Sequence, residues 1–178
     1  QAQAELCYTN IVLRGEAMEL DSANRTRVIV AMSGGVDSSV AAWRLCDQGY
    51  EVIGCTLKTW SGEECGTDRV HGCCSLRDVE DARRVAERLG IPYYVLDSAV
   101  PFKRQVIDYF TSSYANGLTP NPCVVCNNQI KFGTLLERTR ELGGTFVATG
   151  HYARVAFDPG RGRYLLREGV DPQKDQSY

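Results

Sequence analysis

Apolar and polar positions along the chain predict strands and helices in alternation. Short apolar runs that are typical of buried strands occur at 28–31, 51–57, 93–96 and 145–149. Apolar residues recur at helical spacing in 40–45, 78–89, 102–114 and 130–142, and a glycine lies just beyond each of the last three. Strands that alternate with helices predict an α/β fold with a doubly wound, mostly parallel sheet.

The two ends of the chain have a different pattern. Residues 152–157 and 163–167 flank the turn-forming run Asp-Pro-Gly-Arg-Gly and predict a β-hairpin. Residues 1–26 have mixed polarity and little periodicity, which favours an extension ahead of the first strand. We therefore expect one α/β domain at 27–152 and, at 153–178, a hairpin that begins a further region, truncated because the chain is a fragment.

Composition narrows the class of protein. The 43% apolar content of the 178 residues is enough for the core of one domain. The formal net charge of −2 lacks the basic excess of dedicated nucleic-acid binders, so any RNA contact must be local. No apolar run approaches membrane-spanning length, and no signal peptide is recognisable. With eight cysteines, these features favour a cytoplasmic protein with reduced thiols and no membrane partner.

The run SGGVDSS at 33–39 joins the first predicted strand to a helix. Glycines let the backbone approach a ligand, and the N–H groups of such a turn and of a helix N-terminus bind phosphate. The hydroxyls of Ser33, Ser38 and Ser39 can donate to phosphate oxygens, and the Asp37 carboxylate can hold Mg²⁺. The spacing is neither that of a Walker A loop nor that of a dinucleotide fingerprint. It resembles the PP-loop of the ATP pyrophosphatases, which implies ATP as a substrate.

Residues that directly follow parallel strands meet at one edge of the sheet. Besides the loop at 33–39, these are Lys58-Thr59-Trp60 and Gly150-His151. We expect all three segments to reach one nucleotide. For His151, a hydrogen-bonded structural role is the alternative.

Cys123 and Cys126 stand at C-x-x-C spacing behind Pro120 and Pro122. Because the prolines disfavour helix before them, we expect both cysteines on a rigid, extended loop. The spacing fits half of a zinc site, a redox pair, part of an iron–sulfur cluster or a nucleophile with a neighbour.

An insertion at 61–75 holds further metal-ligand types, namely Cys65, His71, Cys73 and Cys74. A zinc site shared with the C-x-x-C pair is conceivable, and a loop of unpaired thiols is the favoured alternative.

Three separated motifs follow the PP-loop in order: TPNPCVVCNNQIKF at 119–132, ATGHY at 148–152 and KDQSY at 174–178. Together they resemble the tRNA 2-thiouridylases (MnmA/TrmU family), over about residues 27–178. The resemblance implies ATP-dependent thiolation of wobble uridine 34 at C2 in the Lys, Glu and Gln tRNAs. The C2 oxygen would be adenylated, and sulfur would displace AMP. The implied partners are tRNA and a sulfur donor, either sulfide or a persulfide carrier.

The resemblance also assigns residues by position. ATP binding falls on Ala31, Met32, Ser33, Gly34, Gly35, Val36, Asp37, Ser38, Leu57 and Gly150, with Asp37 as the Mg²⁺ ligand. The target base falls on Asn121, Pro122 and Cys123, other tRNA contacts fall on Lys174, Asp175 and Gln176, and catalysis falls on Cys126 with Cys123. The second essential cysteine of the family lies beyond Tyr178, so we expect the fragment alone to be inactive.

Cys123 stands where many members of that family have aspartate. The Cys-x-x-Cys branch is associated with a [4Fe–4S] cluster, which implies Cys123, Cys126 and the missing third cysteine as its ligands. Persulfide chemistry assisted by Cys126 is the alternative. Two other functions stay open: another PP-loop adenylating enzyme, such as an amidating synthetase, and a non-catalytic ATP- or zinc-binding module. Amidation leaves the C-x-x-C pair without a role.

Overall fold

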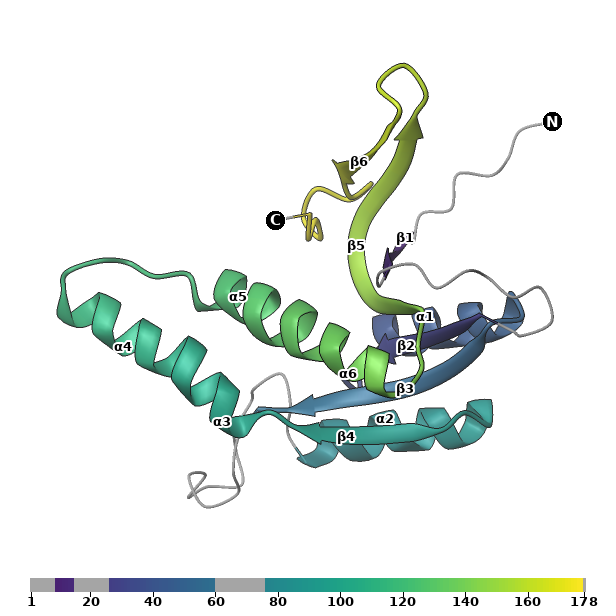
Figure 1. The fold of residues 1–178 in the computed structure, drawn as a ribbon, viewed down its shortest axis with the longest axis horizontal. Coiled ribbons are helices and arrows are strands. Elements are labelled where there is room, and N and C mark those ends of the chain that lie inside the picture. Colours follow the sequence, from purple (N-terminus) through teal and green to yellow (C-terminus); the bar gives the residue numbers. More distant parts are fainter. Residues whose placement is uncertain (1–8, 15–25, 60–75, 178) are drawn as a thin grey trace.

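The computed structural model describes residues 9–14, 26–59 and 76–177, and its described strands form one six-stranded sheet (Figure 1). The strands are β1 (Thr9–Arg14), β2 (Arg27–Ala31), β3 (Glu51–Lys58), β4 (Tyr93–Asp97), β5 (Phe146–Asp158) and β6 (Arg163–Glu168). Their order is β1-β5-β2-β3-β4, and β6 pairs with β5. The pairs β2–β3, β2–β5 and β3–β4 are parallel, which confirms the predicted fold class.

Helices connect the parallel strands. They are α1 (Val36–Asp47), α2 (Leu76–Leu89), α3 (Ala99–Phe102), α4 (Asp108–Ala115), α5 (Pro122–Val125) and α6 (Leu135–Glu141), with π-helical stretches η1 (Lys103–Ile107) and η2 (Cys126–Thr134). η1 joins α3 to α4, and η2 joins α5 to α6, so each set forms one uninterrupted helix in Figure 1. In the part of the chain that the structure describes, no helix has the length and apolarity needed to cross a membrane.

Both faces of the central strand β2 are covered. Successive residues of β2 point to opposite faces: Val28 and Val30 pack with α1 and α2, whereas Ile29 packs with η1, η2 and α6. Each of these three side chains is at most 1% exposed. A strand that is buried on both faces has no polar side, which explains why β2 and most of β3 consist of continuous apolar runs.

β5 is longer than the sequence predicts. We expected a strand at 145–149 followed by a separate hairpin strand, but β5 continues through Gly150 and His151 without a break. Its beginning pairs in parallel with β2, and its residues 153–158 pair antiparallel with β6. β1 pairs with β5 on both sides of Gly150. The β5 backbone therefore has a hydrogen-bonding partner in the region where its pairing changes from β2 to β6.

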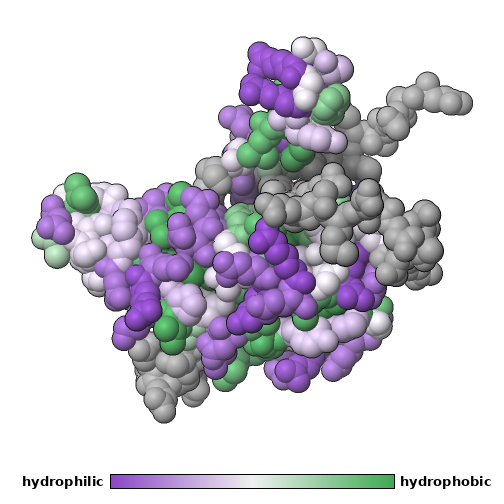
Figure 2. Space-filling view, viewed as in Figure 1, coloured by the Kyte–Doolittle hydropathy of each residue, from purple (hydrophilic) through white to green (hydrophobic). Residues whose placement is uncertain are grey.

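β1 itself lies within 1–26, for which the sequence predicts only an extension ahead of the first strand. The predicted hairpin is confirmed, and it rises away from the rest of the sheet (Figure 1). Its exposed side chains include Phe157 and Tyr164, whose rings pack edge to face 5.2 Å apart. Hydrophilic and hydrophobic surface lie side by side on this projecting part of the molecule (Figure 2). The domain boundaries at 26 and 152 stay a prediction.

Candidate functional site

The loop between β2 and α1 is held in place by the start of α2. Gly34 has a φ of +77°, and a Cβ there would lie 2.4 Å from the carbonyl oxygen of Asp78. Only glycine avoids both the strained backbone and this contact. Asp78 lies in the first turn of α2, and its backbone packs directly against the loop.

The serine hydroxyls of the loop hold its shape. The Ser38 hydroxyl donates to the Gly35 carbonyl oxygen at 3.2 Å and accepts from the Ser33 N–H at 3.2 Å. The Ser39 hydroxyl donates to the same Gly35 carbonyl oxygen at 2.8 Å. Ser38 is buried and Ser33 is exposed, so Ser33 is the better placed of the two to donate to a phosphate.

The N-terminus of α1 suits an anion. Its N-cap residue is Gly35, which has no side chain that could accept a hydrogen bond from the first turn. The first N–H groups of a helix have no intrahelical partner, and they carry the positive end of the helix dipole. Val36 and Asp37 in this first turn are exposed. The loop and the helix start therefore fit the phosphates of ATP.

The Asp37 carboxylate fits Mg²⁺ beside those phosphates. Mg²⁺ is usually bound through one or two carboxylates together with substrate phosphate oxygens, so it requires no cage made of protein alone. Asp37 supplies one exposed carboxylate in the first turn of α1.

β5 reaches the same loop, as predicted. A Cβ at Gly150 would lie 2.6 Å from both the carbonyl carbon of Asp37 and the nitrogen of Ser38. Two positions further along β5, the Tyr152 hydroxyl donates a 2.7 Å hydrogen bond to Oδ1 of Asp37. Sequence reasoning missed Tyr152 as a site residue, although it belongs to the ATGHY motif that carried the resemblance.

The remaining predicted ATP residues lie at the ends of β2 and β3. Ala31 is the last residue of β2, and the Met32 N–H donates to the Cys55 carbonyl oxygen at 2.8 Å. Leu57 lies next to the end of β3 and packs its side chain into the core, so its backbone is the part left for a ligand. Lys58 and Thr59 follow at the same edge, whereas Trp60 lies outside the described residues.

His151 lies where β5 meets the helix η2. Its Nδ1 is 2.8 Å from the Thr149 hydroxyl, and its ring centroid is 6.0 Å from that of Phe132. Burial lowers the pKa of His151, and the nearby positive charge of Lys131 lowers it further. The imidazole is therefore neutral at pH 7, and the hydrogen-bonded structural alternative agrees with its geometry.

His151 should make the protein sensitive to acid. Because its folded pKa lies below the 6.5 of an unperturbed histidine, the unfolded chain binds a proton more readily than the folded one. The stability that the neutral His151 side chain contributes is fully present above pH 6.5, the value for the unfolded chain, and is lost as the pH falls through the lower pKa of the folded protein. We expect His151→Gln in the full-length protein to show a smaller loss of unfolding free energy between about pH 7.5 and pH 5.5.

Urea unfolding at the two pH values measures this difference. His71→Gln is the matched control, because His71 is the other histidine of the chain. An unchanged pH dependence in His151→Gln would contradict the assignment.

Cys123 and Cys126 lie on a helix, so the prediction of an extended loop is wrong. Pro122 is in the first turn of α5, and the side-chain oxygen of Asn121 caps that turn by accepting from the Val124 N–H at 3.2 Å. Proline loses no intrahelical hydrogen bond at the first position of a helix, so Pro122 starts a helix here. The capping role of Asn121 is a signal that the sequence contained.

The two cysteines are neighbours on the helix surface. They are three positions apart, which places side chains on one face. Cys123 is exposed, and Cys126 is half-buried against the core cluster around Ile130. By contrast, burial raises the pKa of the Cys55 thiol to about 12, so that thiol is unreactive.

The described residues do not complete a metal site. Within 9–14, 26–59 and 76–177, no group of three or more His, Cys, Asp or Glu side chains could hold an ion. Cys123 and Cys126 supply two thiols, one short of the three expected for the cluster, so on these residues alone a cluster does not fit. The possible zinc ligands Cys65, His71, Cys73 and Cys74 lie outside the described residues.

The predicted tRNA-contacting residues fold back onto Tyr152. The Gln176 side-chain oxygen accepts from the Tyr152 N–H at 3.1 Å, and the Gln176 N–H donates to the Tyr152 carbonyl oxygen at 2.9 Å. Asp175 accepts from the Gly169 N–H at 2.6 Å, which lowers its pKa. Lys174 remains exposed, and its Nζ lies 5.5 Å from the centre of the Tyr152 ring.

The family model described as the tRNA methyl transferase HUP domain matches residues 26–178. The chain belongs to this family. It is 55% identical over 161 residues to the tRNA-specific 2-thiouridylase MnmA of Carboxydothermus hydrogenoformans, a match that covers 89% of this chain and 44% of that protein. It is 58% identical over 150 residues to the protein of the same name from Moorella thermoacetica, covering 84% and 42%. The resemblance to the 2-thiouridylase family is thereby confirmed.

The chain spans less than half the length of these curated relatives. The family match nevertheless includes the ATP loop, the C-x-x-C helix and the turn at 174–176. Each of these three segments contacts β5, through Gly150, His151 and Tyr152 respectively.

Proposed function

We propose that the full-length protein thiolates uridine 34 of tRNA at C2, and that this chain provides its ATP-binding and cysteine-bearing part. One observation carries the proposal: β5 contacts the ATP loop through Gly150 and, through His151, contacts Phe132 on the helix that also carries Cys123 and Cys126. A reaction that activates a base with ATP and then delivers sulfur needs these two parts side by side. The names of the curated relatives support the choice of reaction.

The first step is activation of the base. The flipped-out uridine presents its C2 oxygen, which attacks the α-phosphorus of ATP while the bond to pyrophosphate breaks. The open N-terminus of α1 holds the phosphates and stabilises the departing negative charge. Mg²⁺ held by Asp37 and the phosphate oxygens would neutralise part of that charge.

The second step is delivery of sulfur. A sulfur nucleophile attacks C2, and the C2–oxygen bond breaks to release AMP. In the persulfide route, the sulfur is carried on a second cysteine elsewhere in the full-length protein. The Cys126 thiolate attacks the inner sulfur of that persulfide, the bond between the two persulfide sulfurs breaks, and the outer sulfur leaves as hydrosulfide, which is the nucleophile that attacks C2. The disulfide that remains between Cys126 and the second cysteine is reopened by an external thiol reductant.

In the second route, a [4Fe–4S] cluster is ligated by Cys123, Cys126 and a third cysteine from outside this chain. The side-by-side placement of the two thiols supports a shared centre, but the described residues alone do not complete one. No step is assigned to the cluster for that reason. Both routes need reduced cysteines, which suits the cytoplasm, and both need the rest of the protein, so we expect this chain alone to be inactive.

The test is pyrophosphate release by the full-length protein with ATP and unmodified tRNA. We expect release to depend on tRNA containing an unmodified uridine 34 and to fall by roughly 10²-fold or more in Asp37→Asn, which removes the charge that holds Mg²⁺. Asp47→Asn, at the opposite end of α1, is the matched control.

Three outcomes separate the alternatives. Release that requires ammonia and no tRNA would favour an amidating synthetase. ATP binding without turnover would favour a binding module. Release that depends on tRNA, with formation of 2-thiouridine, supports the proposed reaction.

A further inference from the structure

Tyr152 touches two parts of the site at once. Its hydroxyl donates to Oδ1 of Asp37 at 2.7 Å, on the ATP loop. Its backbone N–H and carbonyl both bond to Gln176, at 3.1 and 2.9 Å. A displacement of Gln176 would therefore displace the backbone of Tyr152, and with it the hydroxyl that orients the Asp37 carboxylate.

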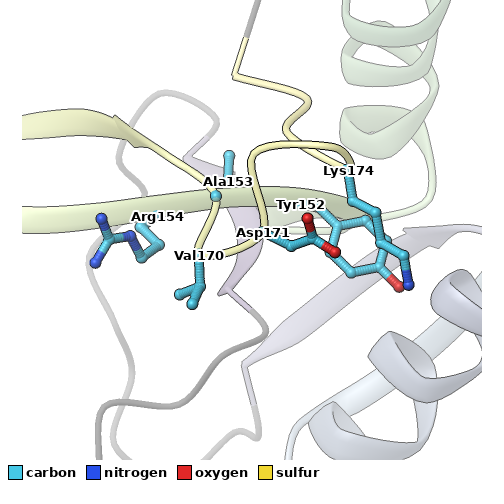
Figure 3. A pocket seen from close by; sticks show the side chains of 7 residues that line it. Tyr152, Ala153, Arg154, Val170, Asp171 and Lys174 are labelled. Carbon is cyan, nitrogen blue, oxygen red and sulfur yellow. The ribbon is translucent and has the colours of Figure 1, made fainter.

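The turn that carries Gln176 also forms a pocket against Tyr152. The pocket has a volume of about 190 Å³ and lies between β5 and residues 169–174. Figure 3 shows the Lys174 side chain extending along the Tyr152 ring, with Asp171 beside it and Arg154 further along β5. The lining carries the cationic Arg154 and Lys174 and the anionic Asp171, so the pocket has a net positive charge, which suits one phosphate of the RNA backbone.

Lys174 links that pocket to Tyr152. Its Nζ is 5.5 Å from the ring centre, within the range of a cation–π interaction. A phosphate that enters the pocket competes with the ring for this ammonium group. An RNA phosphate in the pocket would therefore act on Tyr152 through the side chain of Lys174, and a movement of the turn would act on it through the backbone pairing with Gln176.

We propose that Tyr152 is a positioning residue that couples RNA binding at the turn 169–176 to the orientation of Asp37 on the ATP loop. The inference rests on the proposed function, because it takes the RNA to be the tRNA substrate. A residue that orients a metal-binding carboxylate typically changes metal affinity by about 10- to 100-fold when it is removed. The coupling would make ATP and Mg²⁺ bind most tightly when tRNA is present, which limits wasteful turnover.

The test is an equilibrium measurement on the full-length protein. The dissociation constant of a non-hydrolysable ATP analogue with Mg²⁺ is measured with and without saturating unmodified tRNA. In the wild type we expect tRNA to tighten the analogue by about 5- to 150-fold, and the analogue to tighten tRNA by the same factor. In Tyr152→Phe, which keeps the ring over which Lys174 lies, we expect both factors to fall to within about twofold of one.

Tyr164→Phe is the matched control. Tyr164 is 73% exposed on β6, and phenylalanine keeps its edge-to-face contact with Phe157. We expect this variant to keep the wild-type coupling factor. Thermal unfolding of both variants shows whether either has lost its fold, and a coupling factor of one in Tyr164→Phe would overturn the assignment to Tyr152.

The outcomes separate the inference from the function on which it rests. Wild-type coupling retained in Tyr152→Phe, or a wild type that forms 2-thiouridine without any coupling, would overturn the inference alone. A wild type that binds no tRNA and forms no 2-thiouridine would overturn the proposed function and the inference with it.

Discussion

Replacing Cys126 with alanine should abolish formation of 2-thiouridine in the full-length protein while leaving the ATP half of the reaction in place. We expect the rate of thiolation to fall by roughly 10³-fold or more, because the substitution removes the thiolate that attacks in the sulfur step. The N-terminus of α1 and Asp37 are untouched, so a single turnover should still release pyrophosphate. Quenched-flow assays of pyrophosphate and of 2-thiouridine measure the two steps separately.

Cys46→Ala is the control for this experiment. Cys46 is half-buried on α1, and burial raises the pKa of its thiol, which makes it less reactive than an ordinary cysteine. We expect this variant to thiolate tRNA at a rate within about twofold of the wild type. Thiolation at the wild-type rate by Cys126→Ala would remove Cys126 from the mechanism.

Iron and acid-labile sulfide, measured in the full-length wild type and in Cys123→Ala after anaerobic purification, separate the two sulfur routes. About four irons per chain that are lost in Cys123→Ala would support a cluster. Metal-free wild-type protein that still thiolates tRNA would leave the persulfide route.

Gly150→Ala, on β5, should disrupt the ATP site. The new Cβ would lie 2.6 Å from the backbone of Asp37 and Ser38, so relief requires β5 or the first turn of α1 to move. Overpacking of this kind typically costs about 1–3 kcal/mol in the free energy of unfolding. Because the displaced turn is the one that holds phosphate, we also expect ATP affinity to fall by roughly tenfold or more. Calorimetric titration with ATP and urea unfolding measure the two effects.

Gly35→Ala provides the comparison for stability. Gly35 lies on the same loop, and among the described residues a Cβ there would meet the Ser33 hydroxyl alone, at an ordinary 3.5 Å. We expect its free energy of unfolding to stay within about 1 kcal/mol of the wild type. If Gly150→Ala bound ATP with wild-type affinity, the loop would tolerate the displacement. The close contact between Gly150 and the backbone of Asp37 and Ser38 would then not be needed for ATP binding.

Local patterns in the sequence were sufficient for most of the core. The apolar runs at 28–31 and 51–57 predicted β2 and β3, because strands buried on both faces have no polar positions. The run SGGVDSS predicted the strand–loop–helix unit, since its glycines and the apolar spacing after it act within a few residues. The meeting of this loop with Gly150 also followed from the sequence, because parallel strands end at one edge.

Other features depended on partners that are distant in the chain. Pro122 is compatible with an extended loop or with a helix start, and the outcome here combines the Asn121 cap with packing of Ile130 in the core. Gly150-His151 looked like a strand end, and pairing with β1 and then β6 made it continuous.

The hydrogen bond between Tyr152 and Asp37 joins residues that are 115 positions apart. The sequence by itself determined which residue types are available for ATP and sulfur chemistry, because each motif is local. Only the tertiary structure decided that Tyr152 connects the ATP loop to the turn at 174–176, because that contact depends on where β5 passes α1 and on how the chain folds back after β6.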